Sequence, residues 1–253
     1  MKSYPRQLHL FFNALTYYTR FNAPSWVEFS AESQAQSNRY ITWIGLLVGA
    51  YTALIYWLGS FILPDSIAII LSMATSIWMT GALHEDGLAD SCDGFGGGWD
   101  KQRILTIMKD SHLGSYGVIA LLLVLLLKYN ALLSVEETFL VIIIGHCISR
   151  FYPLLIIYNG KYAGIEEQSK AKVMTAQLSK TDLFVAALPV LICFSFAPWT
   201  YLSVVLPLLF ITVWLTAYFR TWIGGYTGDC LGACQQLIEL TIYIWFCLPW
   251  FIS

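Results

Sequence analysis

Apolar stretches long enough to cross a lipid bilayer recur along this chain of 253 residues. A helix needs about 20 mostly apolar residues to span the hydrocarbon core. Charged residues make up only 12% of the chain, well below the share of about 25% in soluble domains. The sequence therefore predicts an all-α, polytopic membrane helix bundle, a single integral membrane domain over residues 1–253. About seven spans are expected, at 41–63, 66–84, 115–133, 138–158, 183–198, 201–219 and 237–252.

The basic residues orient this bundle, because cytoplasmic segments of membrane proteins carry an excess of lysine and arginine. With the N-terminus in the cytoplasm, 12 of the 14 basic residues fall on inside segments and none on the outside connections. Of the other two, Lys128 is expected near the outer end of a span and Arg150 within one. The pattern predicts three polar loops on the cytoplasmic side, at 85–114, 159–182 and 220–236.

The remaining features of the chain narrow its class. Segment 7–20 mixes apolar and polar residues, which predicts a helix lying along the membrane interface. The formal net charge of −2 argues against nucleic acid as the main partner. None of the six cysteines forms a CxxC pair, so we expect small packing residues and no zinc site.

Acidic residues gather directly after the second predicted span. Asp86, Asp90 and Asp93 are spaced by four and three residues, so on a helix they share one face. Their repulsion costs most beside lipid, and a hard divalent cation with oxygen ligands removes it. The spacing predicts a magnesium or manganese site on these three carboxylates, and substrate phosphates would complete it. His84 and Glu85 are the neighbouring candidates for catalysis, and a solvated acidic helix face is the alternative.

Glycines follow the acidic residues at 94–98. Glycine permits close approach of the backbone to a ligand, and such a loop can cradle phosphate. We expect Gly96 and Gly97 to bind substrate, with a flexible turn between helices as the alternative.

The next segment is basic and begins near residue 101. Positive groups beside a metal site favour an anionic substrate. We expect Lys109 and Asp110 to be catalytic, Asp110 as a possible further metal ligand, and Arg103 and Ser111 to bind substrate. The pattern of apolar residues over 104–108 predicts an amphipathic helix.

Two more polar positions stand close to or within predicted spans. An arginine inside the membrane usually faces a polar cavity, so Arg150 is expected to bind a phosphate or to pair with the acidic cluster. Snorkelling of Arg150 to the interface is the alternative. Gly228 and Asp229 lie in a glycine-rich loop and are expected to bind substrate or a second ligand, unless Asp229 is a helix N-cap. Glu239 is expected at the start of the last span.

Four blocks of the sequence together resemble one family. They are HEDGLADSCDGFGGG at 84–98, IMKDSHLGSYGVIAL at 107–121, ISR at 148–150 and GYTGDCLGA at 225–233. In this order, with membrane spans between them, they resemble cobalamin synthase, also called adenosylcobinamide-GDP ribazoletransferase. The resemblance covers nearly the whole chain, and its one departure is Phe95, where the family pattern has leucine.

The resemblance implies a magnesium-dependent transfer in the bacterial inner (cytoplasmic) membrane. A hydroxyl of α-ribazole, or of its 5′-phosphate, attacks the diphosphate of adenosylcobinamide-GDP, and GMP leaves. Adenosylcobalamin or its 5′-phosphate is the product. An implied site would use the carboxylates and Mg²⁺ on the diphosphate, Lys109 and Arg150 as positive charges, and His84 or a free carboxylate as proton acceptor. A homo-oligomer, or association with other cobalamin-assembly enzymes, would be compatible with this reading.

Three other functions remain open at this point. A CDP-alcohol phosphotransferase also places carboxylates along a membrane helix, although this chain lacks the Ala-Arg of that motif. A divalent-cation transporter would need acidic residues in mid-membrane, and a pathway scaffold would not need a dense ligand cluster. The spacing also predicts that Asp90→Asn cuts activity by orders of magnitude without harming membrane insertion.

Overall fold

The computed structural model describes residues 5–164, 178–249 and 251, and it confirms the all-α fold class. In that part of the chain the only β pairing is an isolated bridge between Tyr162 and Tyr226. The helices are α1 (Arg6–Tyr18), α2 (Ala31–Ser37), η1 (Asn38–Tyr40), α3 (Ile41–Ser60), α4 (Asp65–Thr80), α5 (Leu83–Gly97), α6 (Lys101–Met108), α7 (Ser115–Ser134), α8 (Thr138–Ser149), α9 (Tyr152–Asn159), α11 (Lys180–Phe196), η2 (Trp199–Val204), α12 (Val205–Ile223) and α13 (Gly228–Phe246).

Fewer helices than predicted are both long and apolar enough to cross a membrane. Among the described residues four segments meet this description, and the bent pair of α4 and α5 would make a fifth. The predicted count of seven is therefore not confirmed. Helix α11 has only 17 residues, and α13 carries polar residues along its length. The four segments are Ala31–Ser60, Ser115–Ser134, Thr138–Asn159 and Trp199–Ile223.

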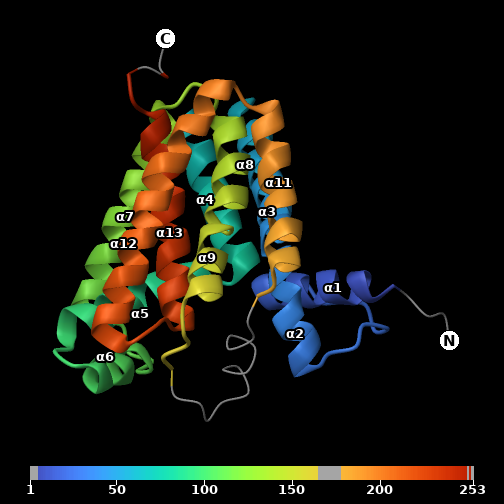
Figure 1. The fold of residues 1–253 in the computed structure, drawn as a ribbon. Helices are drawn as coiled ribbons and strands as arrows, with labels where there is room; N and C mark the ends of the chain where they lie inside the picture. Colours follow the sequence, from blue (N-terminus) through green and yellow to red (C-terminus); the bar gives the residue numbers. More distant parts are fainter. Residues whose placement is uncertain (1–4, 165–177, 250, 252–253) are drawn as a thin grey trace.

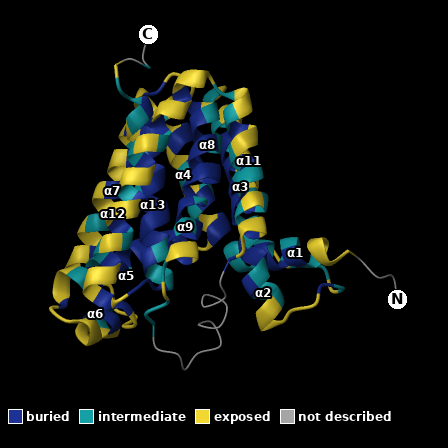
Figure 2. Ribbon diagram, in the orientation of Figure 1, coloured by how far each residue is buried: buried dark blue, intermediate teal, exposed yellow. Residues whose placement is uncertain are grey.

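The long helices run side by side, as Figure 1 shows, and α13 contacts α5, α7, α8, α9 and α12. Burial follows this arrangement. Helix α13 is dark along most of its length in Figure 2, whereas the outward sides of α7 and α12 are exposed. These exposed sides carry large apolar residues such as Leu122, Leu126 and Phe210. Lipid solvates such side chains, so the apolar composition of the chain is accounted for by the outer surface of the bundle.

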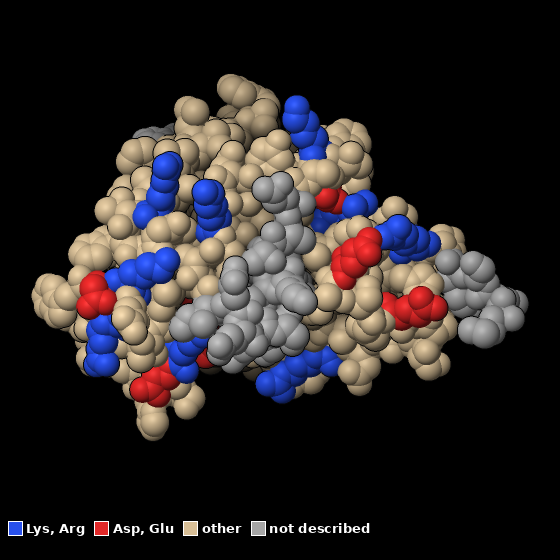
Figure 3. Space-filling model, turned by 60° about the horizontal axis from the view of Figure 1, so that its bottom comes forward, with Lys and Arg blue, Asp and Glu red and all other residues tan. Residues whose placement is uncertain are grey.

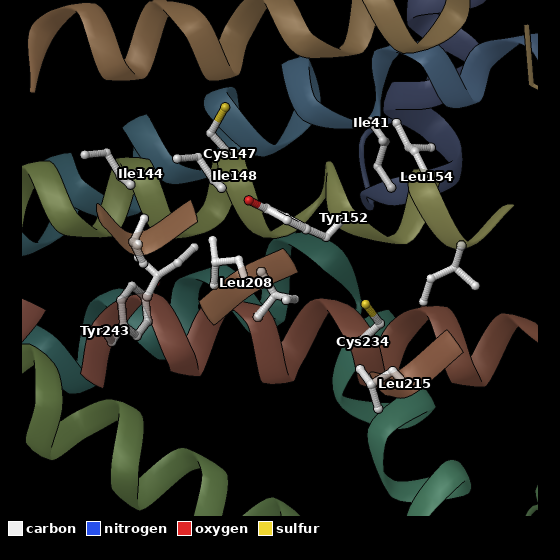
Figure 4. Close-up of a cluster of buried hydrophobic side chains, with 14 of the residues drawn as sticks. Ile41, Ile144, Cys147, Ile148, Tyr152, Leu154, Leu208, Leu215, Cys234 and Tyr243 are labelled. Atoms are coloured by element: carbon white, nitrogen blue, oxygen red, sulfur yellow. The ribbon is translucent and has the colours of Figure 1, made fainter. Parts of the chain in front are cut away.

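Most buried residues of the core come from α8, α9, α12 and α13. Figure 4 shows Ile144 and Ile148 of α8, Leu208 of α12 and Tyr243 of α13 in one cluster. Cys147 and Cys234 lie in the same cluster, and all six cysteines are free thiols. Four of the six are buried, so the interpretation of cysteines as packing residues is confirmed for these four.

The end of the bundle that carries the polar segments also carries the short helices α1, α2 and α6. Helix α1 lies beside this end in Figure 1 and extends away from the long helices, and it includes most of the segment 7–20 that was predicted as an interfacial helix. Figure 3 looks toward this end and shows Lys and Arg side chains on both sides of it. The loop predicted at 159–182 is described only at its two ends, because 165–177 lie outside the described residues.

Candidate active site

Helix α5 carries the acidic cluster, and a sharp bend sets its direction. Gly81 and Ala82 both have left-handed backbone angles, with φ of 65° and 58°. Glycine adopts this conformation without strain, and one such residue ends α4 as another begins α5. The axis of α5 departs from that of α4 by 86°, so α5 leaves the span and lies at the polar end of the bundle.

The helical spacing predicted for the three aspartates is present. Asp86, Asp90 and Asp93 all lie within α5, four and three residues apart. Partial burial, together with the charges of Asp86, Asp229 and Asp93, raises the pKa of Asp90 to about 7. The carboxylates thus share a crowded region, to which the distant residue Asp229 also belongs.

Asp93 has partners that the sequence did not predict. One of its carboxylate oxygens accepts a hydrogen bond from the backbone N–H of Gly114 at 2.8 Å, and the other accepts one from Gly117 at 2.9 Å. These N–H groups belong to the start of α7, where a helix has no internal acceptors for them. A Cβ at Gly114 or Gly117 would lie 2.4 Å from an Asp93 oxygen. The glycines of the segment GSYG therefore make room for a capping carboxylate.

Removal of this cap is expected to loosen the join between α5 and α7. Asp93→Ala should lower the free energy of unfolding by about 1–3 kcal/mol, because a buried N–H group, that of Gly117, and the half-buried N–H of Gly114 lose their acceptor. Thermal unfolding of the purified protein in detergent measures this, with Asp65→Ala, an exposed residue, as control. Unchanged stability with lost activity would instead place Asp93 in the metal site.

Close contact between α5 and α13 brings the distant Asp229 to the acidic cluster. A Cβ on Gly87 would lie 3.0 Å from the backbone oxygen of Asp229 and 3.1 Å from Cα of Gly232. Thr227 is the N-cap of α13, and its hydroxyl accepts a hydrogen bond from the N–H of Cys230 at 3.3 Å. The alternative that Asp229 is the N-cap is therefore wrong. Burial is the main cause of a raised pKa for Asp229, which Asp86 also raises.

This contact gives a second prediction for stability. Gly87→Ala is expected to cost about 1–3 kcal/mol, because the added methyl group meets backbone atoms that cannot rotate away. Gly97→Ala on the same helix is the matched control, since its nearest neighbour is the mobile end of Ile107, at 3.3 Å. Equal melting temperatures for the two variants would contradict this account of how α5 and α13 meet.

A cavity of about 460 Å³ opens beside these helices and holds part of the predicted site. Its polar lining comes from α5, from the end of α6 and from the start of α13. Lys109, at the C-cap of α6, is near enough to Asp229 to lower its pKa, against the larger effect of burial. The predicted residues that line the cavity are His84, Asp86, Lys109, Gly228 and Asp229. The structure thus brings predicted site residues from α5, the end of α6 and the start of α13 to the same cavity.

The glycine run is helical and does not form the phosphate-binding loop that was predicted. Gly96 and Gly97 belong to the last turn of α5 and do not line the cavity. A Cβ on Gly96 would lie 2.6 Å from the ring of Tyr116, and one on Gly94 would lie 2.6 Å from Met108. The absence of side chains on these glycines lets neighbouring segments pack tightly on α5.

Three more predicted residues lie outside the cavity lining, on exposed turns. Arg103 stands in the first turn of α6, where its N–H donates to Asp100 at 3.0 Å. Oδ1 of Asp110 lies 2.6 Å from Nδ1 of His112, and the hydrogen bonds from His112 lower the pKa of Asp110. Ser111 is exposed between them. None of the three touches the cavity in the structure.

Arg150 and Glu85 belong to a polar network inside the bundle. Arg150 is only 2% exposed, so it does not snorkel, and its Nη1 donates to the backbone oxygen of His146 at 2.7 Å. Glu85 accepts a hydrogen bond from Gln236 at 3.1 Å. Among the described residues Arg150 forms no ion pair with a carboxylate of α5, so the predicted pairing with the acidic cluster is not confirmed.

The centre of this network is an ion pair. Lys128 Nζ lies 2.8 Å from Glu239 Oε1 and also donates to Gln236 at 2.7 Å. Lys128 is 4% exposed, so it is buried and does not lie free at the outer end of its span. Glu239 lies in the middle of α13, which begins at Gly228, and accepts from Gln235 at 2.6 Å. Gln235 also lines the large cavity, so the network reaches the candidate site.

Several residues that line the cavity were not predicted from the sequence. Tyr17 and Tyr18 of α1, Tyr162 after α9 and Gln235 of α13 all line it. Tyrosines are common close to a membrane surface, so their presence in the sequence did not mark these three as binding residues. The polar residues of α13 were a signal, because glutamine and glutamate inside an apolar helix need partners in the bundle.

In the described parts of the chain, no three or more His, Cys, Asp or Glu side chains form a ready metal-binding group. The predicted trio of Asp86, Asp90 and Asp93 is therefore not assembled as a complete protein cage. Mg²⁺ is commonly held by one or two carboxylates together with substrate phosphates, and the crowded carboxylates fit that mode.

Comparisons with known proteins agree on one family. A family model described as cobalamin-5-phosphate synthase matches residues 10–247. A protein of Shewanella frigidimarina named adenosylcobinamide-GDP ribazoletransferase is 43% identical over 250 residues, which cover 94% of each chain. A protein of that name from Shewanella amazonensis is 41% identical over 257 residues, or 99% of each chain. No solved structure matches this chain.

Proposed function

This chain belongs to the cobalamin-5-phosphate synthase family, and we propose that it joins adenosylcobinamide-GDP to α-ribazole or α-ribazole 5′-phosphate. In this reaction a ribose hydroxyl attacks the phosphorus next to the corrinoid. A new P–O bond forms, the bond to the bridging oxygen breaks, and GMP leaves. The products are adenosylcobalamin or its 5′-phosphate, GMP and a proton.

One observation carries the proposal: acidic and basic groups from separate helices line one cavity of about 460 Å³. Lys109 offers a positive charge, and Asp86 and Asp229 offer carboxylates that suit a metal-bound diphosphate. Transfer of a phosphoryl group depends mainly on position and on stabilisation of charge. A cavity with both signs of charge, beside the lipid bilayer, supplies both requirements.

Magnesium is the proposed cofactor. We assign Asp86 and Asp90 as its protein ligands, with Asp229 as a further carboxylate of the same region. When bound, the ion would offset negative charge on the diphosphate and on the departing GMP. Asp93 is not assigned a ligand role, because both of its oxygens accept backbone hydrogen bonds.

His84 is the proposed acceptor of the hydroxyl proton. It lines the cavity, whereas its neighbour Glu85 accepts a hydrogen bond from Gln236 in the interior. A general base must come within hydrogen-bond reach of the proton that it removes. Of the two adjacent candidates, only His84 opens onto the space that would hold the substrates.

The proposed setting is the bacterial inner (cytoplasmic) membrane, with the N-terminus and the cavity on the cytoplasmic side. The distribution of lysine and arginine supports this orientation. Phosphorylated substrates of this size do not cross lipid, so an opening toward the cytoplasm gives them access. A homo-oligomer, or contact with other cobalamin-assembly enzymes, would be compatible with this placement.

The test is an assay of GMP release by purified protein in lipid. Adenosylcobinamide-GDP and α-ribazole 5′-phosphate are supplied with magnesium or with a chelator. We expect release of GMP together with a corrinoid product, and loss of both on chelation. Failure of folded protein to release GMP in the presence of magnesium would contradict the proposed substrates. Full activity with the chelator would contradict the proposed magnesium dependence but not the proposed substrates.

A further inference from the structure

Three tyrosines line the large cavity and take no part in the function proposed above. Tyr17 and Tyr18 come from α1, and Tyr162 follows α9. Burial raises the pKa of Tyr17, and the charges of Tyr162 and Asp229 raise it further. The first helix of the chain therefore stands close to the acidic end of α13, across more than 200 residues of sequence.

The tyrosines are held by contacts of their own. The Tyr18 hydroxyl donates to Oδ1 of Asn38 at 2.7 Å, and the rings of Tyr17 and Tyr18 meet edge to face at 4.9 Å. Tyr162 lies edge to face against Tyr226 at 5.9 Å. Backbone hydrogen bonds on either side of Tyr162 tie its loop to Tyr226, at 2.8 and 2.9 Å. Aromatic groups fixed in this way lose little freedom when a ligand binds.

The remaining lining is largely apolar. Leu105 and Met108 of α6, Leu154 and Ile157 of α9 and Leu231 of α13 all contribute side chains. An apolar and aromatic lining beside a few charged groups suits a ligand with a flat ring at one end and phosphate at the other. A nucleoside monophosphate has this form, and bases stack on aromatic side chains.

Size separates the two proposed substrates. The volume of about 460 Å³ falls in the lower part of the range for pockets that enclose drug-sized ligands, roughly 300–1,000 Å³. A nucleoside monophosphate is of that size. A corrinoid ring joined to GDP is several times larger, so at most its GDP end, the guanosine with the diphosphate, would fit inside.

We propose that Tyr17, Tyr18 and Tyr162, the tyrosine wall, bind the flat base of the nucleoside substrate, while the corrinoid ring stays outside the cavity. This assignment rests on the proposed function and adds a role for each part of the lining. The nucleoside base lies against the tyrosine wall. Its ribose then points toward Asp229, which lines the same cavity.

The experiment measures KM for each substrate separately in three variants of the tyrosine wall and in one control variant. Tyr17→Ala and Tyr162→Ala are expected to raise KM for α-ribazole 5′-phosphate by about 5- to 150-fold, the usual effect of losing one stacked aromatic ring. KM for adenosylcobinamide-GDP should change less than about twofold. Tyr17→Phe keeps the ring and should stay near the wild type. Tyr51→Ala is the matched control, because Tyr51 is an exposed residue of α3 away from the cavity.

Equal increases in both KM values, or a fall in kcat alone, would overturn the assignment of the tyrosine wall while leaving the proposed function intact. If the wild type releases no GMP, the proposed function fails, and calorimetric titration of α-ribazole 5′-phosphate into protein in nanodiscs decides the matter. Weaker binding to Tyr162→Ala than to wild type supports the wall, and equal or absent binding to both overturns it.

Discussion

Asp86→Asn is expected to lower kcat/KM for GMP release by about 10²–10³-fold, the usual loss on removing one charged group that stabilises a transition state. Asp86 lines the large cavity, and its charge raises the pKa of both Asp90 and Asp229. Asparagine has nearly the same shape, so helix α5 should keep its packing. Loss of a charged metal ligand is then the main change in the variant.

The measurement is steady-state release of GMP at several magnesium concentrations, in protein shown to be folded by its melting temperature. Asp90→Asn, one turn further along α5, is expected to show the same loss and the same need for more magnesium. Asp65→Asn makes an identical chemical change at an exposed position of α4 and should match the wild type. Full turnover by Asp86→Asn would remove that residue from the proposed metal site.

Glu239→Gln is expected to lower the free energy of unfolding by about 3–5 kcal/mol, because a buried lysine loses its counter-charge. Glu239 is 4% exposed and lies 2.8 Å from Nζ of Lys128, itself 4% exposed. Its other oxygen accepts from Gln235 at 2.6 Å. The ammonium group that remains is almost entirely buried, so its uncompensated charge becomes the dominant cost.

A double variant distinguishes the charge from the packing. Lys128→Met combined with Glu239→Gln removes both charges, so most of the lost stability should return. Lys101→Met, on the exposed side of α6, is the control for loss of a lysine at a surface position. Melting temperatures of the variants in detergent provide the comparison. A double variant as unstable as Glu239→Gln would show that the ion pair itself is not what holds these helices.

Hydropathy predicted the first span well and the last helix poorly. The first span was expected at 41–63 and the helix occupies Ile41–Ser60. The last was expected at 237–252, whereas α13 runs from Gly228 to Phe246. Gln235, Gln236 and Glu239 lower the hydropathy of this helix although all three are buried. A scale based on transfer to lipid treats them as exposed, but their partners are other helices of the bundle.

For the site, local spacing predicted what lies within one helix and not what meets across the fold. The shared face of Asp86 and Asp90 follows from a separation of four residues. The partners of Asp93 are 21 and 24 residues away, so its hydrogen bonds to the start of α7 could not be predicted from local spacing. Arg150 was recognised as costly inside the membrane, yet its network depends on residues of α5 and α13 whose positions the sequence does not reveal.

The Lys128–Glu239 pair also has a consequence for the insertion of the chain into the membrane during translation. The two residues are 111 positions apart in the chain. At about 5–20 residues per second on the ribosome, Glu239 is synthesised about 6–22 seconds after Lys128. During that interval α7 enters the membrane with an unneutralised ammonium group, and α13 is the last long helix to follow it. Helix α13 therefore supplies both the counter-charge of Lys128 and part of the cavity lining. A nascent chain that ends before α13 lacks the neutralised ion pair and the complete cavity.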